Sequence, residues 1–206
     1  MHHTLPSPSL HLPPRYVGLL YVIGGEHSGT CYKSVEVYNP REDKWESAPD
    51  MHFSRSGSGA ASLGGKIYIA GGHDRVTAHS SMECFDPHEN SWSMCAELTY
   101  PCSGVALVAT HTHLYAFGGR SKTNHIYYNK IQRYSPSTDT WEEISTMIQP
   151  RAWPSAVFFN GAIFVVGGFD GRDRLNTVER YDLRSGFRSP MDPMNENRAG
   201  CGAAIV

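Results

Sequence analysis

The chain has 206 residues, of which 40% are hydrophobic, which is enough for one folded domain or two small ones. Its formal net charge of -2 provides no basic surface for the phosphate contacts that dominate nucleic-acid binding, so we expect no nucleic-acid partner. The 20 glycines and 13 prolines, together with 11 tyrosines, favour many short strands separated by turns. The composition therefore predicts an all-β protein.

The chain begins with a proline-rich segment that differs from the rest. We expect residues 1–15 to form a disordered leader outside the folded domain, because prolines are poorly tolerated in sheets. The segment has neither the basic start nor the continuous apolar stretch of a secretory signal. The five scattered cysteines contain no Cys-x-x-Cys pair, which indicates free thiols in a reducing compartment. Because the longest apolar stretch, residues 156–169, is too short to cross a bilayer, we expect a cytoplasmic protein with no membrane partner.

A four-part pattern recurs along residues 16–206. An apolar run ends in a glycine pair, an alternating segment ends in an aromatic residue, a second aromatic follows, and small residues precede the next apolar run. The glycine pairs are Gly24 and Gly25, Gly71 and Gly72, Gly118 and Gly119, and Gly167 and Gly168. The first aromatics are Tyr38, Phe85, Tyr134 and Tyr181, and the second are Trp45, Trp92, Trp141 and Phe187. Four short strands in each repeat predict the blades of a β-propeller, in which glycines allow close approach and large aromatics fill the space between blades.

The order Gly-Gly, Glu-x-Tyr, Trp and Arg-x-Gly resembles the kelch motif, and segments such as GGFDGRDRLNTVERYD are most similar to BTB-kelch (kelch-like) proteins. The resemblance implies a kelch-type β-propeller of four four-stranded blades, at about 16–50, 51–98, 99–147 and 148–194. The first blade starts at its second strand, whereas residues 197–206 resemble an unpartnered first strand. We expect either that this strand closes a four-bladed ring or that the chain is a partial propeller from a six-bladed parent. No BTB or BACK region is present in this chain.

No pattern typical of an enzyme stands out. His111 and His113 lie on one side of an extended segment, but no further ligands follow at metal-site spacing, so we predict no metal site. The residues two positions before the first aromatics are interpreted as structural hydrogen-bond acceptors, and they are Glu36, Glu83, Gln132 and Glu179. Cys102 stands where other repeats have Arg and is interpreted as an inert core thiol. We therefore expect no catalytic residues and no cofactor.

The loops after the glycine pairs vary in length and charge while the strands keep their pattern, so we expect function there. In kelch-like proteins these loops, with those entering the Arg-x-Gly strands, form the face that binds a protein or peptide. The resemblance assigns to this face Arg75, Arg120, Lys122, Tyr127, Arg172 and Arg174, with Arg55, Arg151 and Arg198 at the entries to the first strands. Arginines pair bidentately with carboxylate and phosphate, which favours an acidic or phosphorylated client. For the last three arginines, a structural role repeated in each blade is the alternative.

The resemblance implies a protein–protein interaction module similar to the substrate-recognition part of a cullin-based ubiquitin ligase adaptor. A cullin would bind only through a BTB region, which is not present here. An actin- or cytoskeleton-binding kelch protein is the alternative, and a galactose-oxidase-like enzyme scaffold is a third hypothesis.

Overall fold

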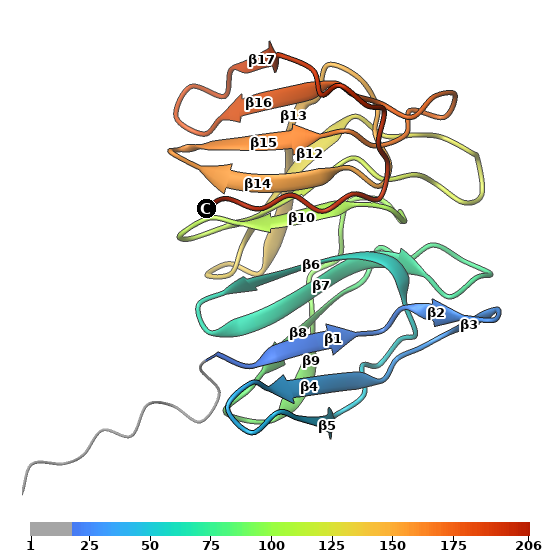
Figure 1. The fold of residues 1–206 in the computed structure, drawn as a ribbon, viewed down its shortest axis with the longest axis vertical. Coiled ribbons are helices and arrows are strands. Elements are labelled where there is room, and N and C mark those ends of the chain that lie inside the picture. The colour runs from blue at the N-terminus through green and yellow to red at the C-terminus, as the bar shows by residue number, and fades with distance from the viewer. Residues whose placement is uncertain (1–17) are drawn as a thin grey trace, which may run out of the picture.

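The computed structural model describes residues 18–206, and the predicted leader at residues 1–15 lies outside them. All the regular structure in this range is β-strand, arranged as four antiparallel meanders that lie side by side (Figure 1). Within the same range no helix is long and apolar enough to cross a membrane. The all-β propeller-type fold expected from the repeats is therefore confirmed.

We number the four sheets as blades in chain order. Blade 1 contains β1 (Leu20–Ile23), β4 (Val35–Asn39) and β5 (Lys44–Ala48), and blade 2 contains β6 (Ser56–Leu63), β7 (Lys66–His73), β8 (Met82–Asp86) and β9 (Ser91–Cys95). Blade 3 contains β10 (Ala106–Ala109), β11 (Leu114–Phe117), β12 (Lys130–Ser135) and β13 (Thr140–Thr146), and blade 4 contains β14 (Ser155–Phe159), β15 (Ala162–Val166), β16 (Val178–Asp182) and β17 (Arg188–Met191). A separate hairpin is formed by β2 (Glu26–His27) and β3 (Thr30–Cys31).

The core of the molecule lies between blades, and β11 shows why. All four of its residues are buried, because blades 2 and 4 cover its two faces. Leu114 and Ala116 pack with residues of blade 2, whereas Tyr115 and Phe117 pack with residues of blade 4. Alternation along a strand thus sends successive side chains into two different interfaces. A strand buried on both faces reads as a continuous apolar run, as this one does.

The second aromatic of each repeat packs against the preceding blade, as predicted, only in blades 2 and 3. Trp92 and Trp141 each donate an indole hydrogen bond to a carbonyl of the blade before, at 2.8 and 3.1 Å. Trp45 is 50% exposed because no described strand precedes blade 1, and Phe187 is 66% exposed. In blade 4 the neighbouring Arg188 instead donates to the carbonyl and hydroxyl oxygens of Thr146. The prediction that Trp45 and Phe187 fill an interblade space is therefore wrong.

Within residues 18–206 the ring of blades is not closed. The inner strand β10 contacts both β6 and β14, but the sheet of β1 has three strands and no inner strand of its own. The place of an inner strand is a groove of about 420 Å³ between β1 and β6. Residues 197–206 form no strand with β1, because Arg198 and Gly200 bond instead to blade 4 and to Trp153. This corrects the expectation of a closing strand.

Two buried ion pairs tie the entry of an inner strand to the third strand of the same blade. The Arg55 guanidinium donates to Glu83 at 2.9 Å and to the Gly71 carbonyl at 2.7 Å. Arg151 repeats these contacts in blade 4, with Glu179 at 2.8 Å. Both arginine side chains are 0% exposed. Guanidinium donors thus satisfy carbonyls at the strand ends that water cannot reach.

Blade 3 replaces both members of this ion pair. Cys102 stands in place of the arginine and Gln132 in place of the glutamate, so no buried charge is left unpaired. The Gln132 side-chain oxygen accepts hydrogen bonds from the Thr99 amide and hydroxyl, both at 2.8 Å. Burial raises the pKa of the Cys102 thiol to about 12, which agrees with the predicted inert core thiol.

We expect the Glu83 contacts to make stability dependent on pH. Burial works against ionisation of Glu83, but hydrogen bonds from the His52 amide and from Arg55 outweigh it, so its folded pKa lies below the usual value of 4.5. The stabilisation is therefore complete above pH 4.5 and lost as the pH falls through the folded pKa. The free energy of unfolding, measured with urea, should be lower for Glu83→Gln than for wild type at pH 7. The difference between the two proteins should become smaller below pH 4.5. Glu42→Gln, at an exposed position, should have the same free energy of unfolding as wild type at both pH values.

Candidate functional site

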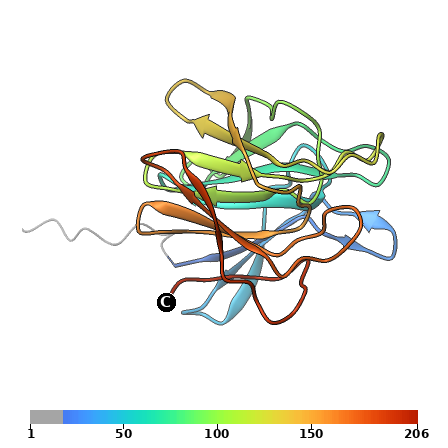
Figure 2. The ribbon, with the colours of Figure 1, turned by 90° about the horizontal axis from the view of Figure 1, so that it is seen from above.

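The loops that follow the glycine pairs project from one side of the molecule, on the right of Figures 1 and 2. The glycine pairs produce this arrangement. Gly71 and Gly72, for example, have φ of 65° and 90°, in the left-handed region that favours glycine. The Gly72 amide donates to the Cys102 carbonyl of the next blade at 2.9 Å, and the Gly72 carbonyl accepts from His79 at 2.8 Å. The same bonds recur at the other three pairs. Each loop is therefore anchored at its base by the chain that enters the following blade. We call this side the loop face.

The predicted partner-binding residues divide into two groups. Six are at least partly accessible from the loops, namely Arg75, Arg120, Lys122, Tyr127, Arg172 and Arg174, and Arg198 is exposed at the entry after blade 4. Arg55 and Arg151 are fully buried in their ion pairs, so they are not available to a partner. The structural alternative is thus the correct one for these two, and their assignment to the binding face is wrong.

Trp153 lies at the centre of the loop face and was missed by the sequence reasoning. Its amide donates to the Gly104 carbonyl at 2.7 Å, the Gly104 amide donates to Gly57 at 2.7 Å, and the Gly200 amide donates to Trp153 at 2.9 Å. These four residues hold the same place in successive repeats, two positions after the arginine or cysteine. Three are glycines, and Trp153 shares their left-handed backbone with φ of 52°. A bulky residue in this conformation is strained, and such strain is concentrated at functional sites.

The Arg120 guanidinium lies over the Trp153 ring, 5.0 Å from its centroid. The position of Arg120 is fixed by two main-chain bonds with Ser103, at 2.8 and 3.0 Å. Because the Arg120 Nε is buried without a hydrogen-bond partner, an anion could meet the stacked guanidinium only at its terminal nitrogens. Nearby, Tyr127 packs edge-on against Phe169 with ring centroids 5.4 Å apart. The centre of the face therefore combines aromatic surface with a preorganised cation.

Most of the charged side chains on the loop face that form no ion pair are positive. Arg120, Arg174 and Arg198 form no ion pair within residues 18–206. The acids Asp74 and Asp170 instead accept main-chain amides of their own turns, at 2.8 to 2.9 Å. Those amide hydrogen bonds hold the pKa of Asp170 below its usual value. Because these arginines form no ion pair and the neighbouring acids already accept main-chain amides, the loop face favours an anionic ligand.

A family model described as the KLHDC2/KLHL20/DRC7 Kelch-repeats domain matches residues 14–168 and, in a second overlapping match, residues 57–206. The chain belongs to the kelch-repeat family. The kelch pattern of glycine pair, aromatic and Arg-x-Gly thus coincides with the contacts within and between blades described above.

Three kelch-like relatives resemble part of the chain. Kelch-like protein 4 of Homo sapiens is 34% identical over 76 residues, which cover 37% of this chain and 11% of that protein. Kelch-like protein 7 of Rattus norvegicus is 41% identical over 61 residues, covering 30% and 10%. Kelch-like protein 35 of Mus musculus is 36% identical over 72 residues, covering 35% and 12%. Each alignment therefore spans about a tenth of the relative's length.

A solved structure titled "Structure of YjhT" superimposes on this kelch chain with a TM-score of 0.71. The match covers 86% of this chain and 66% of that one at 14% sequence identity, so it shows a shared fold only. Within the kelch repeats, the tryptophan of Arg151-Ala152-Trp153 was the available signal for the centre of the site, because the other three repeats have glycine there.

Proposed function

We propose that this kelch chain is a protein-interaction module whose loop face binds an acidic or phosphorylated segment of a client protein. The observation that carries the proposal is Trp153, held in a backbone conformation that the other repeats reserve for glycine, with Arg120 stacked on its ring. Aromatic and arginine residues are the side chains that most often dominate binding energy at protein interfaces. Arg75, Lys122, Arg172, Arg174 and Arg198 would form the charged rim.

Within the kelch-like context, the chain would act as the client-recognition part of a cullin-based ubiquitin ligase adaptor. In this role it binds the client and does not itself contact a cullin, for which a BTB region would be needed. We propose no catalytic activity and no cofactor for this function. The proposal concerns the loop face, so it can be tested without identifying the rest of the assembly.

We expect Trp153→Ala to weaken client binding by at least about 2 kcal/mol, as for other central aromatic anchors. Clients captured from lysate by the full chain would be identified by mass spectrometry, and their affinities measured for wild type and variant. Trp45→Ala is the matched control, since Trp45 is exposed on β5 rather than on the loops. Equal effects of the two substitutions would contradict the assignment of Trp153.

Charge is tested separately in the same experiment. Arg174→Glu should reduce capture and weaken its dependence on salt, whereas Arg41→Glu, in the turn between β4 and β5, should not. Capture that is unchanged by Arg174→Glu would remove the acidic-client proposal. Sedimentation of the wild-type chain with filamentous actin would instead favour the cytoskeletal alternative.

A further inference from the structure

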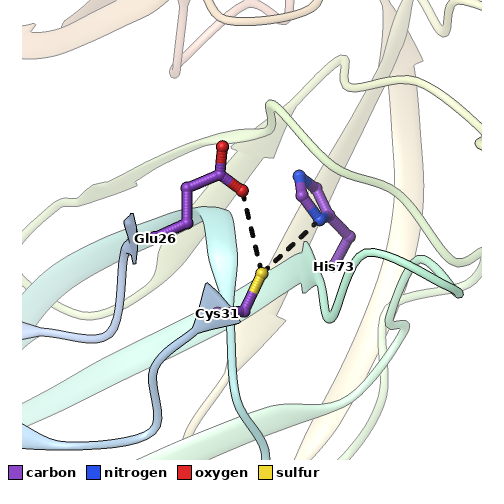
Figure 3. Close-up of side chains that lie close together, drawn as sticks. All are labelled: Glu26, Cys31 and His73. Carbon is purple, nitrogen blue, oxygen red and sulfur yellow. Dashed lines mark hydrogen bonds between the residues drawn. The ribbon is translucent and has the colours of Figure 1, made fainter. Parts of the chain in front are cut away.

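Three side chains with different metal-binding donors converge between blades 1 and 2 at the loop face (Figure 3). Glu26 and Cys31 face each other across the β2–β3 hairpin, with a carboxylate oxygen 3.8 Å from the Cys31 sulfur. His73, the last residue of β7 in the next blade, places Nδ1 4.0 Å from the same sulfur. All three donor atoms lie within 4.8 Å of one another.

We propose that Glu26, Cys31 and His73 form a binding site for a zinc-like divalent cation, with a fourth position open to water or to a ligand. Thiolate, imidazole and carboxylate together suit Zn²⁺, and a soft thiolate disfavours Mg²⁺ and Ca²⁺. With metal–ligand bonds of about 2.0 to 2.3 Å, tetrahedral donors lie roughly 3.5 Å apart. The two separations from the Cys31 sulfur, 3.8 and 4.0 Å, exceed this by about half an ångström or less, and the third lies within 4.8 Å, so side-chain rotations would be needed to bring the donors to binding distance.

The histidine presents the nitrogen that such a site needs. Nδ1 accepts a hydrogen bond from the Arg75 amide at 3.1 Å, so it is unprotonated and the ring carries its proton on Nε2. The cation would replace the Arg75 amide on this lone pair, at the cost of one hydrogen bond.

The donors gain a negative charge toward a dication once the Cys31 thiol has lost its proton. Burial, with Glu26 and also Asp74, raises the pKa of the Cys31 thiol, and Arg75 lowers it. A Cys31 thiolate with Glu26 and Asp74 would carry three negative charges, and the cations nearby are Arg75, Arg120 and Lys122. Binding would release one proton from Cys31, because a thiol binds zinc as the thiolate.

The ligand positions explain why the sequence predicted no metal site. Glu26 and Cys31 are brought together by the hairpin, and His73 is contributed by a different repeat, 42 residues after Cys31. His111 and His113, the histidines that the sequence singled out, instead contact Phe158 and Tyr115. A bound cation would fasten the β2–β3 hairpin of blade 1 to the end of β7 in blade 2.

Cobalt provides a direct test on the full chain. Titration with Co²⁺ should produce a thiolate-to-cobalt charge-transfer band and tetrahedral d–d bands at one equivalent, and Zn²⁺ should displace them. Cys31→Ser should abolish the charge-transfer band, and His73→Ala should weaken cobalt binding at least tenfold. Cys201→Ser and His125→Ala remove a thiol and an imidazole elsewhere in the chain, and both should leave the spectrum unchanged.

A second measurement needs no variant. In the wild-type chain, Zn²⁺ should slow alkylation of Cys31 by iodoacetamide at least tenfold, as followed by mass spectrometry of the labelled peptide, and should leave Cys201 unaffected. No charge-transfer band, loss of the band in Cys201→Ser, or no protection of Cys31 would each overturn the proposal. These results do not depend on client binding, so they are separate from the tests of the proposed function.

Discussion

Arg151→Ala is expected to destabilise the protein by about 3–5 kcal/mol, which is typical when one partner of a buried ion pair is removed. The substitution leaves the Glu179 carboxylate buried without its guanidinium partner. It also removes the donor to the Gly167 carbonyl at 2.6 Å. Urea unfolding of both proteins at the same pH would measure the difference in free energy of unfolding.

The cause of this loss can be isolated with two further variants. Arg151→Met combined with Glu179→Leu removes both charges and should recover much of the stability, because no buried charge is left alone. Arg198→Ala, at the exposed equivalent position, should change stability by less than about 0.5 kcal/mol. A double variant as unstable as Arg151→Ala would show that the carbonyl contacts, rather than the unpaired charge, carry the effect.

Gly71→Ala is expected to cost at least about 3 kcal/mol, from backbone strain and a steric clash together. Gly71 has φ of 65°, and an added Cβ would lie 2.7 Å from the Cys102 carbonyl oxygen and 3.1 Å from Val105 Cγ1. That carbonyl accepts the interblade hydrogen bond from Gly72, so relieving the clash would stretch the contact between blades 2 and 3. Thermal or urea unfolding would measure the loss.

Gly161→Ala is the matched control for Gly71→Ala. Gly161 has a similar φ of 73°, but an added Cβ would meet nothing within 4 Å. This substitution should therefore cost only the left-handed strain of roughly 1–2 kcal/mol. Equal losses at the two positions would show that Gly71 is required for its backbone conformation alone.

The blades could be predicted from sequence because their determinants are local and repeated. Glycine pairs, apolar runs and aromatics recur in register, and the main-chain hydrogen bonds of the glycine pairs form wherever two blades meet. Trp45 and Phe187 departed from the prediction because their surroundings depend on the neighbouring blade rather than on their own repeat. A repeat therefore specifies its own sheet more fully than the environment of its outer strand.

The site was less predictable, and the arginines show the reason. Arg55 and Arg174 are indistinguishable as residue types, yet one is buried against Glu83 and the other is exposed on a loop. The joint replacement of Arg by Cys102 and Glu by Gln132 in blade 3 was a signal in the sequence that these positions pair structurally. Trp153 in a glycine position was a second such signal. Glu26, Cys31 and His73 come together only through the packing of two blades, so they form no recognisable motif in the sequence.

The main-chain hydrogen bonds that join the first three glycine pairs to the next blade also affect how the chain resists unfolding. Each blade is linked through them to its immediate neighbour, as in a linear array with nearest-neighbour coupling. Blades 2 and 3 have neighbours on both sides, whereas blade 1 exposes the edge of β1 and blade 4 is followed by no further sheet in the described residues. Amide hydrogen exchange should therefore form a gradient, slowest in β7 and β11 and fastest in β5 and β17. The loop face would then be most rigid at its centre, where Trp153 and Arg120 lie.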